Sequence, residues 1–266
     1  METVHRGSFQ LYPDDLVGAD TPPADEEMAL LILNEPIPRN ARALLAAVWE
    51  RASYRLCADG GGNQLYTLCE EDGTLGQLVP DAVVGDLDSL KPAVHKYFEE
   101  RGAVVCRCND QDSTDFMKGL EYLDAVLRKG KDARSCVVVV VGGLGGRLDH
   151  IMHTLKVLFN NHQQRQIVVV SSENLTFVLP AGRSRILTSP LVDGPACGIL
   201  PLAGPTTLTT SGLRWNLDRH PSSFEGLMST SNIIDEREVI VDTAVPVAWT
   251  TQFRPKPAAP ICSDAS

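Results

Sequence analysis

The feature that most constrains the fold is a run of five consecutive valines at residues 137–141, preceded by Cys136 and followed by Gly142. β-Branched side chains favour strands over helices. A run with no polar residue on either side of the pleat fits a strand that is covered on both faces. The run therefore predicts a buried strand of a parallel sheet.

Similar short apolar runs alternate with helical patterns through the first two thirds of the chain. Apolar positions recur at helical spacing around Phe116, Leu120 and Leu123, and again around Ile151 and Leu155. We expect helices there and at residues 41–51, and further strands at 29–33, 54–58, 82–84, 103–106 and 167–170. Strands that alternate with helices predict a doubly wound, mainly parallel α/β domain.

The helical pattern stops after about residue 172. Short strand candidates follow, punctuated by Gly, Pro, Asn and Asp at intervals of roughly 8–12 residues, which is typical of an antiparallel β-sandwich. They are residues 175–179, 185–187, 197–200, 206–210, 226–229, 238–241 and 247–251. We therefore expect a flexible extension at 1–27, an α/β domain at 28–171, a β-sandwich domain at 172–253 and a flexible tail at 254–266.

The charge balance excludes some partners. The chain has 24 Lys and Arg against 34 Asp and Glu, a formal net charge of -10, which disfavours nucleic acid and anionic membranes. No apolar run approaches the roughly 18 residues of a membrane span, and the acidic beginning of the chain is unlike a signal peptide. Several of the seven cysteines lie in apolar runs, as expected of reduced thiols, so we expect a cytoplasmic protein.

Polar sequence follows four of the predicted strands. Because parallel strands end at the same edge of a sheet, where ligands of such sheets bind, these segments are expected to meet there. The four are Ala-Asp-Gly-Gly-Gly-Asn (58–63), Gly-Asp-Leu-Asp-Ser (85–89), Asn-Asp-Gln-Asp-Ser-Thr-Asp (109–115) and Gly-Gly-Leu-Gly-Gly-Arg-Leu-Asp-His (142–150).

Six aspartates at these strand ends would crowd one crevice, where unpaired carboxylates repel each other. They are Asp59, Asp86, Asp88, Asp112, Asp115 and Asp149. Oxygen ligands without His or Cys spacing indicate Mg²⁺, which also binds substrate phosphates. The alternative is that each aspartate forms a turn or caps a helix. Spacing alone supports both interpretations equally for Asp86 and Asp88, and it favours the turn for Asp110 and Asp112.

The glycine-rich turn at residues 142–146 ends a strand and opens a helix, where backbone N–H groups can bind an anion. It lacks the Lys-Ser/Thr of a P-loop, and Leu148 departs from the dinucleotide-binding pattern. Tight strand-to-helix packing is the alternative. Arg147 directly after the turn could bind phosphate oxygens or pair with Asp149.

Trp215 lies in the second domain, within Gly-Leu-Arg-Trp-Asn-Leu (212–217). A tryptophan in a sandwich is most often part of the core, which sequence alone favours. The alternative is an exposed ring that stacks on a flat or cationic ligand.

Taken in order and spacing, the four strand-end motifs, residues 212–217 and Ser-Thr-Ser-Asn (229–232) closely resemble the thiamin pyrophosphokinase family, in its animal form, over roughly residues 28–252. The resemblance implies an α/β domain followed by a β-sandwich, in a homodimer whose active sites lie between the two domains of different subunits. It implies transfer of a diphosphoryl group from ATP to the hydroxyethyl group of thiamin, which gives thiamin diphosphate and AMP.

The resemblance also implies roles for individual residues. The catalytic set would be Asp59, Asp86, Asp88, Asp115 and Arg147, with Mg²⁺ held by Asp86, Asp88 and Asp115. ATP would be bound by Gln111, Thr114, Arg147 and Asp149. Trp215 would stack on the thiamin pyrimidine, and thiamin would also be lined, from the partner subunit, by Ser229, Ser231 and Asn232.

Two other functions compete with this one. Asp86-Leu87-Asp88 is a D-x-D, the arrangement by which metal-dependent nucleotide-sugar transferases hold Mn²⁺, but the sandwich and the Gly-Gly-Arg turn fit that class poorly. A thiamin- or nucleotide-binding protein without turnover is the other alternative. The filled acidic positions disfavour it.

Overall fold

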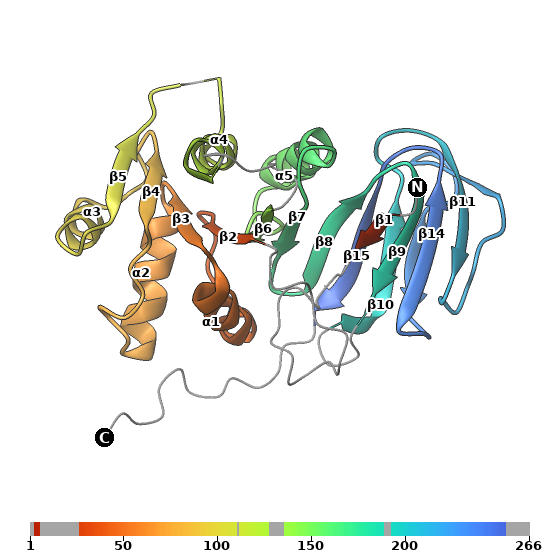
Figure 1. Cartoon of the computed structure of the whole chain (residues 1–266), viewed down its shortest axis with the longest axis horizontal. Coiled ribbons are helices and arrows are strands. Elements are labelled where there is room, and N and C mark those ends of the chain that lie inside the picture. Colours follow the sequence, from red (N-terminus) through yellow and green to blue (C-terminus); the bar gives the residue numbers. More distant parts are fainter. Residues whose placement is uncertain (1–2, 6–26, 111, 128–135, 189–192, 254–266) are drawn as a thin grey trace.

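The computed structural model describes residues 3–5, 27–110, 112–127, 136–188 and 193–253. An α/β part lies at one end of the long axis and a β-sandwich at the other (Figure 1). No helix in these ranges is both long enough and apolar enough to cross a bilayer.

Six parallel strands form the α/β part, in the order β5-β4-β3-β2-β6-β7. The valine run lies in β6, which is paired on both sides and buried at every residue, so the predicted two-sided burial is confirmed. The strands are β2 (Glu27–Ile32), β3 (Tyr54–Ala58), β4 (Ala82–Gly85), β5 (Val104–Arg107), β6 (Cys136–Val141) and β7 (Ile167–Val170).

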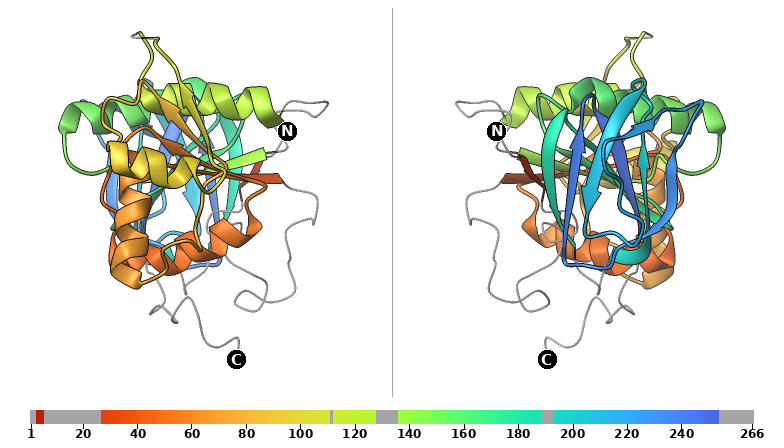
Figure 2. Two further views of the ribbon diagram at one scale, coloured as in Figure 1. Left: turned by 90° about the vertical axis from the view of Figure 1, so that its left-hand side faces the viewer. Right: turned by 90° about the vertical axis from the view of Figure 1, so that its right-hand side faces the viewer.

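Helices cover both faces of this sheet, as expected of a doubly wound fold. Seen end on, α4 and α5 lie along one face and α1 and α2 along the other (Figure 2), each face packing on its own apolar cluster. The helices are α1 (Arg42–Arg51), α2 (Gly61–Asp72), α3 (Pro92–Glu99), α4 (Asp115–Leu127) and α5 (Leu148–Asn161), with a 3₁₀ turn at Arg39–Ala41. The sequence did not predict α2 or α3, because one begins with two glycines and the other spans only eight residues.

The sandwich pairs the end of the long sheet with a second sheet in the order β1-β9-β14-β11-β12. Its strands are β1 (Thr3–His5), β8 (Asn174–Leu179), β9 (Gly182–Leu187), β10 (Asp193–Leu200), β11 (Thr206–Ser211), β12 (His220–Ser222), β13 (Ser229–Ile233), β14 (Glu238–Thr243) and β15 (Val247–Phe253). The predicted strand at 226–229 is wrong. The Gly226 N–H bonds back to the Ser223 carbonyl in a turn, and the strand starts at Ser229.

The two parts share one sheet. β8 pairs antiparallel with β7, so the six parallel strands continue through β8, β15, β10 and β13 into a single ten-stranded sheet. One apolar cluster likewise runs from Met28 to Phe253. Three residues of the segment expected to be flexible, Thr3–His5, pair with β9, while residues 6–26 and the tail at 254–266 lie outside the described ranges.

Candidate active site

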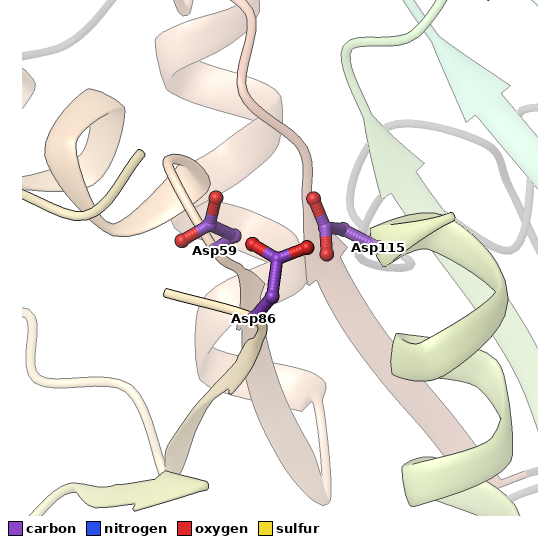
Figure 3. Close-up of side chains that lie close together, drawn as sticks. All are labelled: Asp59, Asp86 and Asp115. Atoms are coloured by element: carbon purple, nitrogen blue, oxygen red, sulfur yellow. The ribbon is translucent and has the colours of Figure 1, made fainter. Parts of the chain in front are cut away.

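Three aspartates from three different elements meet at the carboxyl edge of the parallel sheet (Figure 3). Asp59 directly follows β3, Asp86 directly follows β4, and Asp115 is the first residue of α4. Each offers a carboxylate oxygen, and these oxygens all lie within 4.8 Å of one another. The structure thus brings together three of the six aspartates that the strand-end pattern selects.

Both the backbone conformation of Asp59 and the burial of its carboxylate are energetically unfavourable. Its φ is +41°, a left-handed conformation that L-residues rarely adopt, and only 1% of its surface is exposed. The Ser89 N–H donates to its Oδ2 at 3.2 Å, whereas the buried Oδ1 has no hydrogen-bond partner among the described residues. A strained backbone combined with an unsatisfied buried oxygen is typical of a functional site.

Gly85 at the end of β4 makes the close approach of the aspartates possible. A Cβ at this position would lie 2.6 Å from the Asp59 Cβ and 3.0 Å from the Asp115 Oδ1. Any side chain here would push the carboxylates apart. The glycine that precedes Asp86 is therefore required by the geometry of the cluster.

Lys118 is a site residue that the sequence reasoning missed. Its side chain is 2% exposed, and its ammonium lies 3.1 Å from the Asp86 Oδ2 and 3.3 Å from the Asp115 Oδ1. It follows Asp115 by three residues on α4, which places both side chains on one face of the helix. Its position on the otherwise apolar face of a predicted helix is the sequence feature that could have identified it as a site residue.

The environment shifts the pKa values of these groups in opposite directions. Burial, followed by the charge of Asp115, raises the pKa of Asp59. Burial also raises the pKa of Asp115. The hydrogen bond from Lys118 lowers the pKa of Asp86. Burial alone would lower the pKa of Lys118, but its bonds to Asp86 and Asp115 outweigh burial and raise it.

A divalent cation fits these residues. Three carboxylates face one ammonium, so negative charge is in excess, and the unpartnered Asp59 Oδ1 lies within the group. Clustered oxygen ligands without histidine or cysteine suit a hard cation such as Mg²⁺.

Asp88, which the resemblance places among the metal ligands, lies outside this group. Its side chain is exposed and accepts a hydrogen bond from the Ser89 hydroxyl at 2.9 Å. Strand alternation would point Asp86 and Asp88 the same way. Leu87 between them has a left-handed φ of +63°, which breaks the alternation. Spacing arguments could not detect that turn.

The segment before α4 mixes turn and candidate site residues. Asp110 accepts the Asp112 N–H at 2.9 Å, so the turn interpretation of this pair is confirmed. Thr114 accepts the Met117 N–H at 3.5 Å and so caps α4. Gln111, a predicted ATP ligand, lies outside the described residues.

The backbone N–H groups of the glycine-rich turn before α5 already bind a carboxylate of the protein itself. The carboxylate of Glu35, just past β2, accepts the N–H groups of Gly143 at 2.6 Å and Gly145 at 3.1 Å. The sequence reasoning missed Glu35, although it follows a predicted strand as the other site segments do. Arg147 and Asp149 form a two-pronged ion pair at 3.1 and 2.5 Å, the alternative that the sequence had left open for Arg147.

The predicted thiamin-side residues gather in the sandwich. Trp215 is 57% exposed, so its interpretation as a core residue is wrong and its ring is accessible. The side chain of Asn232 is buried and bonds both the N–H and the carbonyl of Trp215, at 3.2 and 2.9 Å, and it also donates to the Ser229 hydroxyl. Ser231 is exposed, with a left-handed φ of +56°.

The acidic cluster and the Trp215 group lie far apart in one chain. β13, which carries Asn232, is the first strand of the ten-stranded sheet, and β3, which precedes Asp59, is the eighth. Seven strand spacings of about 4.8 Å amount to roughly 34 Å. Within one chain, the two groups therefore lie on strands that are widely separated across the sheet.

This arrangement defines a class of protein, an α/β domain with a candidate cation and phosphate site whose sheet continues into a β-sandwich. Comparison with known proteins makes the assignment specific. The family model for the catalytic domain of thiamin pyrophosphokinase matches residues 45–170, and the model for its vitamin B1 binding domain matches residues 183–248. The chain belongs to the thiamin pyrophosphokinase family.

Individual relatives agree with the family models. Thiamine pyrophosphokinase 1 of rice (Oryza sativa subsp. japonica) is 37% identical, over 88% of this chain and 91% of the rice protein. Thiamin pyrophosphokinase 1 of Caenorhabditis elegans is 29% identical, over 77% and 82%. Among solved structures, yeast thiamin pyrophosphokinase superimposes with a TM-score of 0.77 at 25% identity, over 91% of this chain and 94% of that one.

Proposed function

We propose that this chain is a thiamin pyrophosphokinase, which transfers the diphosphoryl group of ATP to the hydroxyethyl oxygen of thiamin and releases AMP. Its membership of the family over both domains carries the proposal. The acidic cluster at the carboxyl edge of the sheet supports it, because family membership alone leaves open whether the site is intact. The net charge of -10 is compatible with ATP, since a bound cation reverses the local sign.

In this proposal Asp59, Asp86 and Asp115 hold Mg²⁺ through carboxylate oxygens. The bound ion supplies charge neutralisation for the phosphates and for the cluster itself. Lys118 keeps Asp86 and Asp115 in place and adds positive charge beside them.

The thiamin hydroxyl oxygen attacks the β-phosphorus in line, and the bond from that phosphorus to the oxygen of the α-phosphate breaks. An aspartate of the cluster takes the hydroxyl proton. Arg147, which Asp149 holds in the resting state, offsets the charge that develops on the leaving AMP. Thr114, which precedes Asp115, and Asp149, which follows Arg147 by two residues, also contact the nucleotide. Positioning and charge stabilisation therefore supply most of the rate, as is usual in phosphoryl transfer.

The thiamin end of the site comes from a second copy of the chain. The seven strand spacings between β3 and β13 in one chain, roughly 34 Å measured along the sheet, support this, because one thiamin is too short to span them. The sandwich half also carries exposed apolar side chains, namely Phe224 at 71% and Leu227 at 42%, which suit burial in a homodimer. The ring of Trp215 stacks on thiamin, and Ser229, Ser231 and Asn232 line the pocket.

The first experiment measures AMP formation from ATP with and without thiamin and Mg²⁺. We expect AMP only when all three are present. Release of UDP from a nucleotide sugar would instead support the transferase alternative, and thiamin binding without AMP would support a binding protein.

Free thiols at the six cysteines within the described ranges support the proposed cytoplasmic location.

A mixing experiment tests the shared site. Asp86→Asn and Trp215→Ala are each expected to be inactive as homodimers. After subunit exchange, a mixed dimer has one site with both defects and one site with neither, so activity returns. Sites formed within a single chain would give no recovery on mixing. Sedimentation of the unmixed protein reports the dimer directly.

A further inference from the structure

Glu35 lies where the topology of the sheet places a ligand. From β2 the chain builds the sheet outward to β5 and then returns to add β6 on the other side of β2. Such a reversal, here at the carboxyl ends of β2 and β6, is the usual binding place in sheets of this kind. Here Glu35 reaches from the end of β2 to the glycine-rich turn after β6 and bonds the Gly143 and Gly145 N–H groups at 2.6 and 3.1 Å.

The turn is shaped around this carboxylate. A Cβ at Gly145 would lie 2.2 Å from the Glu35 Oε1, and one at Gly142 would lie 3.0 Å from the Glu35 Cβ. Gly142, Gly143 and Gly146 also have φ values of +92°, +92° and +74°. The glycines that the sequence offers as an anion cradle therefore accommodate a side chain of the protein itself.

Without an anchor, this turn would be costly to order. Four of its five residues are glycines, which lose more conformational freedom on ordering than any other residue. Two hydrogen bonds to a charged acceptor are among the strongest single contacts that can restrict it. Arg147, the next residue, is the N-cap of α5, and the described residues give its side chain only Asp149 as a partner.

We propose that Glu35 is a positioning residue for the nucleotide: its carboxylate fixes the glycine-rich turn and thereby presents Arg147 to ATP. The proposal rests on the proposed function, in which Arg147 contacts the phosphates. It has a second consequence. The Gly143 and Gly145 N–H groups are occupied by Glu35, so the phosphate chain is held by Arg147 and the cation of the acidic cluster.

The test compares Glu35→Ala, Glu35→Asp and Glu35→Gln with Glu50→Ala, which removes an exposed glutamate of α1. Alanine removes the acceptor, and aspartate is one methylene too short to reach both N–H groups. Aspartate loses at least one charge-assisted hydrogen bond and should raise the KM for ATP roughly tenfold. Alanine loses both bonds and should raise this KM at least as much. The KM for thiamin should stay unchanged in both variants. Glutamine keeps an acceptor oxygen and should restore most of the affinity. Glu50→Ala should match the wild type.

Hydrogen exchange provides a readout that does not depend on turnover. The Gly143 and Gly145 amides should be protected in the wild type and in Glu35→Gln, and they should exchange rapidly in Glu35→Ala and Glu35→Asp. Equal protection in all variants would overturn the proposal. An unchanged or lowered KM for ATP in Glu35→Ala would also overturn it, because the carboxylate would then be inert or would compete with phosphate.

The two proposals fail in different ways. If the wild type makes no AMP from ATP and thiamin, the proposed function is wrong. The role of Glu35 is then tested by the increase in Tm on adding Mg-ATP instead of by the KM for ATP. A smaller increase in Glu35→Ala than in the wild type supports the role of Glu35, and an equal increase rejects it. If the wild type makes AMP and the variants behave like it, only the role of Glu35 is wrong.

Discussion

Asp59 lowers the stability of the folded chain at the candidate site. It combines a left-handed backbone, a carboxylate that is almost fully buried and an oxygen without a partner. Each of these features costs free energy in the folded chain. The arrangement is useful only if something binds there, which is why this residue marks the site more clearly than any motif does.

Asp59→Asn should therefore stabilise the protein without metal while abolishing turnover. The pKa of Asp59 is raised, so the folded chain holds this proton more tightly than the unfolded chain. Stability then falls as pH rises from the ordinary aspartate pKa of about 3.9 through the raised value, and the loss persists above it. We expect a gain in the free energy of unfolding at pH 7 that vanishes below pH 4. Urea unfolding in EDTA at both pH values measures it, and a less stable variant at pH 7 would contradict it.

Lys118→Met tests the counter-charge in the cluster. Removing the ammonium leaves Asp86 and Asp115 facing each other, and we expect a loss of about 2 kcal/mol, below the full range for a buried pair because both carboxylates are partly exposed. Adding Mg²⁺ should recover part of this loss, so the Tm increase on Mg²⁺ addition should be larger than in the wild type. Lys96→Met, which breaks an exposed pair with Glu100, is the control and should change nothing measurable. Equal Tm increases would mean that the ion does not bind beside Lys118.

At the scale of elements, the site depends on how strands end rather than on the strands themselves. β3 and β4 are ordinary buried strands, and each is followed at once by a turn with a left-handed residue, Asp59 or Leu87. These turns decide which carboxylates point into the cluster. They direct Asp86 inward and leave Asp88 in solvent.

Gly85→Ala should separate the positioning of the cluster from the stability of the fold. The added Cβ would lie 2.6 Å from the Asp59 Cβ and 3.2 Å from its Cα, so the backbone after β3 must move. A displacement of this order lowers turnover about 100-fold. Gly119→Ala is the control, because its nearest contact is a Leu31 methyl group at 3.0 Å that can shift. AMP formation is measured for both variants, and near-normal turnover of Gly85→Ala would show that the close approach is not required.

At the scale of the whole molecule, the family's two domains are one structural unit in this chain. β7 and β8 join the parallel strands to the sandwich, and the larger apolar cluster draws side chains from both. Separating the halves would expose the edge of β7 and part of that cluster to water. An exposed apolar sheet edge favours aggregation.

The full chain should therefore unfold in one calorimetric transition, whose enthalpy equals the van't Hoff enthalpy evaluated for a dimer that unfolds to two separate chains. A fragment of residues 27–172 should fail to fold alone, as judged by the dispersion of its NMR signals. Two separate transitions, or a folded fragment, would show that the shared sheet contributes little cooperativity.

The amino-acid sequence determined much of this protein by itself, because local periodicity follows from burial. Unalternated valines are typical of a strand covered on both faces of a parallel sheet, and aspartates that follow parallel strands are expected at one edge of it. Local signals failed where propensity was weak, as in α2 and α3, and where a turn replaced strand geometry, as at residues 226–229.

Only the tertiary structure decided which polar groups share the site. Lys118 entered the cluster because packing of α4 placed it beside Asp86, and Glu35 reached the glycine-rich turn across 108 residues of sequence. Asp88 left the cluster because of the conformation of one intervening residue. Contacts between side chains depend on backbone directions that are set by long-range packing, which no local pattern encodes.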